Sequence, residues 1–290
     1  MTHRESVGRA DRVSGAVVGS AAGDALGAPF EFGPTGVFTA RFPDGVGTLC
    51  GGGGWDPGEA TDDTQMAVLV GESLLERGRL DLPDVFDRFR RWAAGEPKDI
   101  GLQTEDVLTN GEPWDLAAAL HFQLNGRAAG NGSLMRATTS AVYFAHAGRP
   151  ATMEAARRIA ALTHGDRAAW EGTAVFHELV RAALAGDDPL AAVPGALAEV
   201  HADHRARWEA VLAPGWHPGL ASAVDVGGDT DTVAAVTGGL AGAVYGIGAV
   251  PDRWTGPLHV PLPGYGDRCL RTEDLLTLAG RLDAEGPRTA

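Results

Sequence analysis

Apolar residues recur at intervals of three and four along most of this chain. That spacing indicates amphipathic helices, and the sequence has no run of alternating strand segments joined by hairpin signals. We therefore predict an all-α fold, a compact single-domain multi-helix bundle over residues 1–290 with flexible ends at 1–12 and 285–290. The predicted helices cover residues 12–28, 62–77, 82–94, 116–125, 133–147, 153–162, 168–185, 189–201, 232–247 and 273–283.

Two predicted helices carry a small residue at every fourth position. Each glycine inside a helix costs about 1 kcal/mol relative to alanine, so the pattern calls for a compensating contact. We interpret it as a ridge that lets a neighbouring helix approach closely, the alternative being a composition that is simply rich in alanine and glycine. The residues are Gly15, Gly19, Gly23 and Gly27 in one helix and Ala234, Gly238, Gly242 and Gly246 in the other.

The segment 32–60 is rich in glycine and proline and has little helical period. A loop of this length inside a compact domain is usually functional, so we predict an ordered loop or lid. Its run Gly51-Gly52-Gly53-Gly54 is no phosphate-binding P-loop, because no Gly-Lys-Ser/Thr follows it. It is interpreted as the approach to the acidic residues that come next.

Composition narrows the functional classes. The formal net charge of −14 argues against general nucleic-acid binding, which depends on positive charge. Cys50 and Cys269 lie far apart and form no metal-binding pair, which fits a reducing cytoplasm. We find no membrane segment and no export signal, because the apolar stretch from Val13 is interrupted at Asp24.

Two acidic motifs stand at predicted helix starts: Thr61-Asp62-Asp63-Thr64 and Gly228-Asp229-Thr230-Asp231-Thr232. Threonine and aspartate are common helix caps, which explains one such motif structurally. The repeated pattern instead suggests a metal site, since oxygen-only ligands suit Mg²⁺ or Mn²⁺ and not zinc. Aspartates brought this close would repel one another unless cations lay between them.

A third motif, Gly130-Asn131-Gly132-Ser133-Leu134-Met135-Arg136, could bind an anion. Its glycines allow a ligand close to the backbone, and the N–H groups of a helix starting near Ser133 would face a diphosphate. Taken alone, Gly-Asn-Gly-Ser is also an ordinary turn.

Together these motifs, in this order, make the chain resemble the ADP-ribosylglycohydrolases, a family that includes the dinitrogenase reductase-activating glycohydrolase and the mammalian ADP-ribosyl-acceptor hydrolases. The resemblance runs from Gly19-Ser20-Ala21-Ala22-Gly23-Asp24-Ala25-Leu26-Gly27 to about Trp254. It implies a compact all-α domain with a centre of two Mg²⁺ ions, or Mn²⁺. The implied metal ligands are Thr61, Asp62, Asp63, Asp229, Asp231 and Thr232.

The resemblance also implies catalytic and substrate-binding residues. Glu31 matches a glutamate near the metals and is our candidate for acid/base work, and Asp99 matches an aspartate beside the scissile sugar. Without the family, these two would be an exposed glutamate and a helix cap, His164 a helix C-terminal cap and Trp254 a core residue. The implied substrate contacts are Gly130, Asn131, Gly132, Ser133, Met135, His164, Gly228 and Trp254.

The implied activity is hydrolysis of the bond between ADP-ribose and an acceptor on an ADP-ribosylated protein. Arginine is the first choice of acceptor, with serine or another O-linked acceptor next. Two alternatives remain: a non-catalytic ADP-ribose-binding or crystallin-like protein, and a two-metal phosphohydrolase that cuts the diphosphate. Asp225 stands where the family often has asparagine, and it would either add charge beside the ribose or cap a turn.

Overall fold

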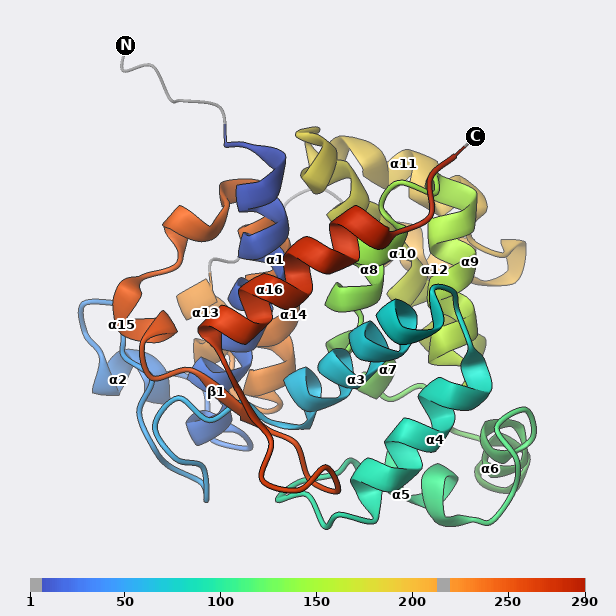
Figure 1. Ribbon diagram of the computed structural model, residues 1–290, viewed down its shortest axis with the longest axis horizontal. Helices are drawn as coiled ribbons and strands as arrows, with labels where there is room; N and C mark the ends of the chain where they lie inside the picture. Colours follow the sequence, from blue (N-terminus) through green and yellow to red (C-terminus); the bar gives the residue numbers. More distant parts are fainter. Residues whose placement is uncertain (1–6, 213–219, 290) are drawn as a thin grey trace.

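The computed structural model describes residues 7–212 and 220–289, and the all-α prediction is confirmed (Figure 1). The elements are α1 Arg9–Gly27, η1 Ala28–Phe30, α2 Val37–Arg41, α3 Asp62–Arg77, α4 Leu82–Ala93, α5 Leu102–Thr109, α6 Ala117–Asn125, α7 Gly132–Met135, α8 Thr138–Phe144, α9 Arg149–Ala160, α10 Arg167–Ala185, α11 Pro189–Glu199, α12 Ala202–Val211, α13 Leu220–Asp225, α14 Thr230–Tyr245, η2 Ile247–Ala249, α15 Asp252–Thr255, β1 His259–Pro261, β2 Cys269–Arg271 and α16 Thr272–Glu285.

Several sequence predictions need correction. The single helix predicted over 133–147 is wrong, because α7 ends at Met135 and α8 begins at Thr138. Arg136 at the break is fully buried, so tertiary contacts interrupt a stretch that has no proline. α1 begins at Arg9, so residues 9–12 are helical. The antiparallel pair β1 and β2 and the short helices α2, α5, α12, α13 and α15 were not predicted.

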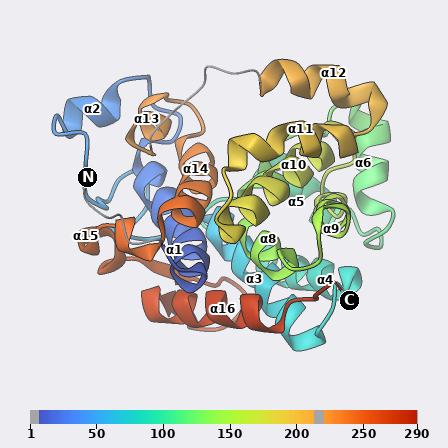
Figure 2. The same ribbon diagram turned by 90° about the horizontal axis from the view of Figure 1, so that it is seen from above.

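The predicted close packing of the two glycine-bearing helices is confirmed. α1 and α14 lie side by side in both ribbon views, and α1 meets α14 more extensively than it meets any other element (Figure 2). A Cβ added to Gly19 would overlap the carbonyl of Gly238, and one added to Gly23 would overlap that of Ala234. Backbone therefore meets backbone along the pair, which only residues without large side chains permit.

The antiparallel pairing has a consequence for the ends of these helices. Gly27, the last residue of α1, lies against Thr230 and Asp231 at the start of α14. The glycine ridge therefore places the second acidic motif beside the C-terminal turn of α1.

Further helices surround this pair with one extended apolar core. α3, α8 and α16 pack on one another, and α10 packs against α8 and α9. Large buried side chains such as Trp92, Phe86 and Met66 fill the interior. A smaller cluster including Met153 lies around α9, α10 and α11, and Leu240 of α14 packs against both clusters.

The segment 32–60 is ordered and includes α2. Phe30, Phe38 and Phe42 pack together with ring centroids 5.2–6.3 Å apart, which anchors α2 to η1, the turn that follows α1. At the other end of the segment, the Ala60 N–H donates to the His259 carbonyl at 2.9 Å. This contact with β1 directs the chain into α3.

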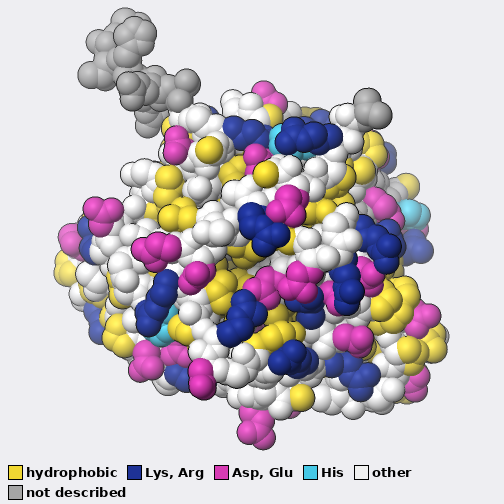
Figure 3. Space-filling view, in the orientation of Figure 1, with side chains coloured by type: hydrophobic (Ala, Val, Ile, Leu, Met, Phe, Trp, Pro, Cys, Tyr) yellow, Lys and Arg dark blue, Asp and Glu magenta, His cyan; other side chains and the backbone are white. Residues whose placement is uncertain are grey.

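The surface shows no single dominant charge on the face seen in Figure 3, where basic and acidic side chains are interspersed. Both cysteines are free thiols. Among the described residues, none of the helices combines the length and apolar character that crossing a bilayer requires.

Candidate active site

The two acidic motifs, distant in sequence, meet in space. The Thr232 hydroxyl donates to Asp63 Oδ2 at 3.4 Å, joining the first turn of α14 to the first turn of α3. Asp62, Asp63 and Asp231 are each buried at this junction. The two motifs therefore form one cluster, which the sequence alone left open.

A carboxylate on α1 holds the start of α3 in place. Asp24, fully buried, accepts hydrogen bonds from the N–H groups of Thr61 and Thr64 at 3.1 Å and from the Thr64 hydroxyl. Thr61 is the N-cap of α3 and accepts from the Asp63 N–H at 3.3 Å. Free N–H groups of a helix start are thus satisfied by side chains, and the Asp62 and Asp63 carboxylates project from the first turn.

The start of α14 is held by α1 and by the segment that follows α1. The Thr230 hydroxyl donates to the Gly27 carbonyl at 2.9 Å. Gly227 and Gly228 have φ of +79° and +75°, a left-handed conformation that favours glycine. Gly228 exchanges backbone hydrogen bonds with the segment that carries Glu31, accepting from the Phe32 N–H at 2.7 Å and donating to the Gly33 carbonyl at 3.1 Å.

Glu31 joins the acidic cluster through this pairing. Carboxylate oxygens of Glu31, Asp229 and Asp231 all lie within 4.8 Å of one another. Burial, then the negative charges of Asp99, Asp229 and Asp24, raise the pKa of Glu31 to about 7. Asp99 is therefore near enough for its charge to act on Glu31 and on Asp62.

The cluster carries more negative charge than its hydrogen bonds can stabilise. Burial and neighbouring carboxylates hold the pKa values of Asp62 and Asp63 well above their ordinary range, and raise the pKa of Asp231 to about 10. Among the described residues, Asp63 Oδ1 and Asp229 Oδ1 are buried without a hydrogen-bond partner. Oxygen donors, unpartnered lone pairs and uncompensated charge together fit hard divalent cations.

The third motif borders the same cluster. The Asn131 side-chain amide donates to Asp229 Oδ2 at 2.6 Å. The loop just before α7 therefore contacts the start of α14. Gly130 and Asn131 are exposed, whereas His164 is buried directly behind the loop. Gly228, a further predicted contact, is exposed beside Asp229.

Three predicted substrate contacts have side chains that point elsewhere. The Ser133 hydroxyl pairs with Thr173 of α10 at 3.0 Å, and Met135 is part of the apolar core. Trp254 is also a core residue, and its indole N–H donates to the Gly47 carbonyl at 3.3 Å.

Asp225, which stands where the family often has asparagine, uses its carboxylate in hydrogen bonds within the protein. Its carboxylate accepts from the Thr39 N–H at 2.9 Å and from the Thr39 hydroxyl at 2.7 Å, which ties α13 to α2. The turn-capping interpretation of this residue fits these bonds.

Sequence reasoning assigned no role to Asp24 or Arg136, although both lie inside quoted motifs. Asp24 carried a signal, since it is a charged residue within a run of small residues in the first helix. Arg136 carried none, because its burial depends on α9 and on the Phe89 ring, over which its guanidinium lies at 4.7 Å. Asp24 bonds to the start of α3, and Arg136 bonds to Thr163, next to His164.

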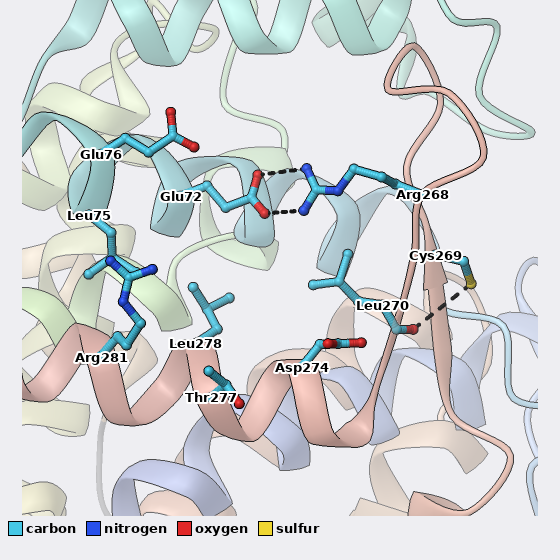
Figure 4. A pocket seen from close by; sticks show the side chains of 10 residues that line it. All are labelled: Glu72, Leu75, Glu76, Arg268, Cys269, Leu270, Asp274, Thr277, Leu278 and Arg281. Atoms are coloured by element: carbon cyan, nitrogen blue, oxygen red, sulfur yellow. Dashed lines mark hydrogen bonds and ion pairs between the residues drawn. The ribbon is translucent and has the colours of Figure 1, made fainter.

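A separate cavity of about 450 Å³ lies between the C-terminal half of α3, β2 and α16 (Figure 4). Arg268 faces Glu72 across it and pairs with that carboxylate at 2.5 Å, while Arg281 pairs with Glu285. Arg268 and Glu72 thus compensate each other's charge, and none of the acidic motif residues lines the cavity. The acidic cluster remains the candidate active site.

Comparison with known proteins identifies the family of the chain. The profile of the ADP-ribosylglycohydrolase family matches residues 5–217 and 206–289. The chain is 29% identical to ADP-ribosyl-[dinitrogen reductase] glycohydrolase of Rhodospirillum rubrum, over 93% of this chain and 97% of the relative. It is 28% identical to ADP-ribosylarginine hydrolase Tri1 of Pseudomonas putida (strain GB-1), over 84% and 73%. A solved ADP-ribosylglycohydrolase-related protein complex superposes with a TM-score of 0.73 at 34% identity, covering 96% of this chain and 99% of the other.

Proposed function

Because this chain belongs to the ADP-ribosylglycohydrolase family and is thus a hydrolase acting on ADP-ribosylated substrates, we propose that it cleaves the N-glycosidic bond of ADP-ribosyl-arginine in a reaction that requires two divalent cations. The observation that carries the proposal is the junction of α3 and α14. Carboxylates meet there, and within the described part of the chain Oδ1 of Asp63 and Oδ1 of Asp229 are buried without a hydrogen-bond partner. The relative from Pseudomonas putida is named for ADP-ribosylarginine, which favours that linkage.

The cations would be Mg²⁺ or Mn²⁺, because the donors are oxygens only. Bound there, they would supply Lewis acidity, which orients sugar hydroxyls, makes water a better nucleophile and offsets the negative charge of the cluster. The residues that would hold them are Thr61, Asp62, Asp63, Asp229, Asp231 and Thr232.

Glu31 is the proposed proton carrier. Its carboxylate lies within 4.8 Å of those of Asp229 and Asp231, beside the proposed cation site, and a carboxylate in that place suits general acid/base catalysis. Water adds to the anomeric carbon, the bond from that carbon to the arginine nitrogen breaks, and Glu31 moves the proton between water and the leaving guanidine. The products are ADP-ribose and unmodified arginine.

The charge of the site favours a cationic acceptor. Glu31 lies on the acidic cluster, and Asp99 is near enough for its negative charge to raise the pKa of Glu31, so a guanidinium near them would be attracted. A serine acceptor offers no positive charge to these carboxylates. We therefore rank arginine before serine and other O-linked acceptors.

The diphosphate would lie against the glycine-containing loop. Gly130 and Asn131 are exposed there and Gly132 is half-buried, with the buried His164 next to both glycines. Glycine lets a phosphate approach backbone N–H groups, which are good donors to anions.

The test is mass-spectrometric identification of products from arginine-linked and serine-linked ADP-ribosyl peptides, with Mg²⁺ and then with chelator. We expect metal-dependent release of intact ADP-ribose from the arginine-linked peptide. AMP plus ribose phosphate would instead indicate a phosphohydrolase. Tight ADP-ribose binding without release from either peptide would indicate a binding or crystallin-like protein.

The variant Glu31→Gln tests the proton carrier. It removes the titrating group and keeps the shape, so we expect kcat to fall by about 10²- to 10⁴-fold while ADP-ribose still binds. Glu209→Gln, at an exposed carboxylate of α12, is the matched control and should keep full activity. Unchanged turnover in Glu31→Gln would contradict the assigned role.

A further inference from the structure

Arg136 is a buried cation that forms no ion pair with a carboxylate among the described residues. It is 0% exposed, and its Nη2 donates to the Thr163 hydroxyl at 2.7 Å. Burying a guanidinium is costly, and a general structural role would be filled as well by an apolar side chain. The contact with Thr163 therefore calls for an explanation.

The hydrogen bond continues from Thr163 to the neighbouring histidine. Thr163 Oγ1 lies 2.8 Å from His164 Nδ1, and both residues are buried. Arginine can only donate, so it occupies a lone pair of the Thr163 oxygen. Among the described residues, His164 Nδ1 is the one other hydrogen-bond partner of this hydroxyl. A buried hydroxyl hydrogen needs an acceptor, so it donates to His164 Nδ1, which requires Nδ1 to be unprotonated.

This direction sets the state of the imidazole. With Nδ1 accepting, a neutral ring carries its proton on Nε2. Burial, with the charges of Arg136 and His121, holds the pKa of His164 well below its ordinary range, so the ring stays neutral. The series of hydrogen bonds from Arg136 through Thr163 to His164 thus leaves one donor on the imidazole, Nε2–H, on the side away from Thr163.

The Nε2 end faces the glycine-containing loop. A Cβ added to Gly130 or to Gly132 would lie 3.5 Å from His164 Nε2. Gln103 connects the same two segments, because its amide donates to the Thr163 carbonyl at 3.0 Å and accepts from the Gly130 N–H at 3.3 Å. The histidine and the loop are therefore held in one fixed arrangement.

We propose that Arg136 and Thr163 are positioning residues that fix His164 as an Nε2–H donor toward a diphosphate bound at the loop of Gly130 and Gly132. Neither residue touches the ligand. The ligand class rests on the proposed function, whereas the direction of the hydrogen bonds does not. A donor locked in advance binds an anion without the cost of selecting a tautomer on binding.

The experiment reads the tautomer directly, by two-bond ¹⁵N–¹H correlation spectra of the histidine rings at neutral pH. The His164 signals are assigned by their loss in His164→Asn. We expect the Nε2–H pattern in the wild-type protein and in Thr163→Ser, which keeps the hydroxyl. Thr163→Val removes the hydroxyl at similar size, so the pattern should shift toward Nδ1–H or a mixture.

ADP-ribose binding by calorimetry is measured on the same samples. We expect Thr163→Val to weaken binding about tenfold or more, and Thr163→Ser to stay within about twofold of wild type. An Nδ1–H or charged His164 in the wild type overturns the proposal, even if Thr163→Val does not fold. An unchanged tautomer in folded Thr163→Val overturns it too. The expected tautomers without any ADP-ribose binding would support the hydrogen-bond arrangement and contradict the proposed function.

Discussion

Phe32, next to Glu31, holds a backbone conformation that residues with side chains rarely adopt. Its φ is +58°, and its side chain is 81% exposed. The hydrogen bond from the Phe32 N–H to the Gly228 carbonyl keeps it in this state. Strain of this kind concentrates at functional sites, where surrounding contacts determine the conformation. The same backbone pairing with Gly228 accompanies the place of Glu31 beside Asp229 and Asp231.

We expect Phe32→Gly to raise the free energy of unfolding, or to leave it unchanged, despite the loss of a large aromatic side chain. Glycine relieves a left-handed strain of about 1 kcal/mol, and an exposed ring contributes little burial. Urea denaturation measures the change. A loss of more than about 1 kcal/mol would mean that the ring packs in solution.

At the scale of elements, the contact between α1 and α14 decides the geometry of the site. The small residues on each helix bring the backbones together, and the same contact sets the start of α14 beside Gly27. Asp24 on α1 simultaneously receives the start of α3. One helix thus positions both acidic motifs.

Gly238→Ala should therefore destabilise the protein by about 1–3 kcal/mol or more, because its Cβ would overlap the Gly19 carbonyl. It should also lower activity by displacing the start of α14. Gly280→Ala in α16 is the matched control, since its Cβ would meet nothing within 4 Å. That change should stabilise by about 0.5–1 kcal/mol through helix propensity alone. Thermal unfolding compares the two, and equal effects would argue against close packing.

At the scale of the whole molecule, the acidic cluster couples stability to pH. Burial raises the pKa of Asp24 to about 6 and that of Glu31 to about 7, and Asp231 titrates still higher. The folded state then binds more protons than the unfolded state above the carboxyls' ordinary pKa values. Stability from these groups is therefore complete at low pH and is lost as pH rises through the folded-state pKa values.

We expect the Tm of the chelator-treated protein to fall by several degrees between about pH 5 and about pH 8. Mg²⁺ or Mn²⁺ binds deprotonated carboxylates, so its addition should raise the Tm more at the higher pH. Differential scanning fluorimetry with and without cation measures both effects. A metal-induced shift that is larger at pH 5 would contradict the proposed ligands.

Local sequence pattern alone predicted the helical class, the glycine ridges and the two acidic helix starts. These features depend on residues close together in the chain, and there the spacing of apolar residues and the residues that cap helices can be recognised in the sequence. The role of Glu31, by contrast, came from resemblance to a family, since its own sequence neighbourhood is unremarkable for a loop.

Only the tertiary structure decided which groups meet. The helix breaks at Arg136, which no local pattern indicates. Asp24 supports the start of α3 and Asn131 bonds to Asp229, so both contacts link residues far apart in the sequence. The burial of Trp254 was likewise set by packing around Gly47. Propensity and period act within a few residues, whereas hydrogen-bond partners and burial depend on segments brought together by the complete fold, and this is where the sequence by itself could not decide.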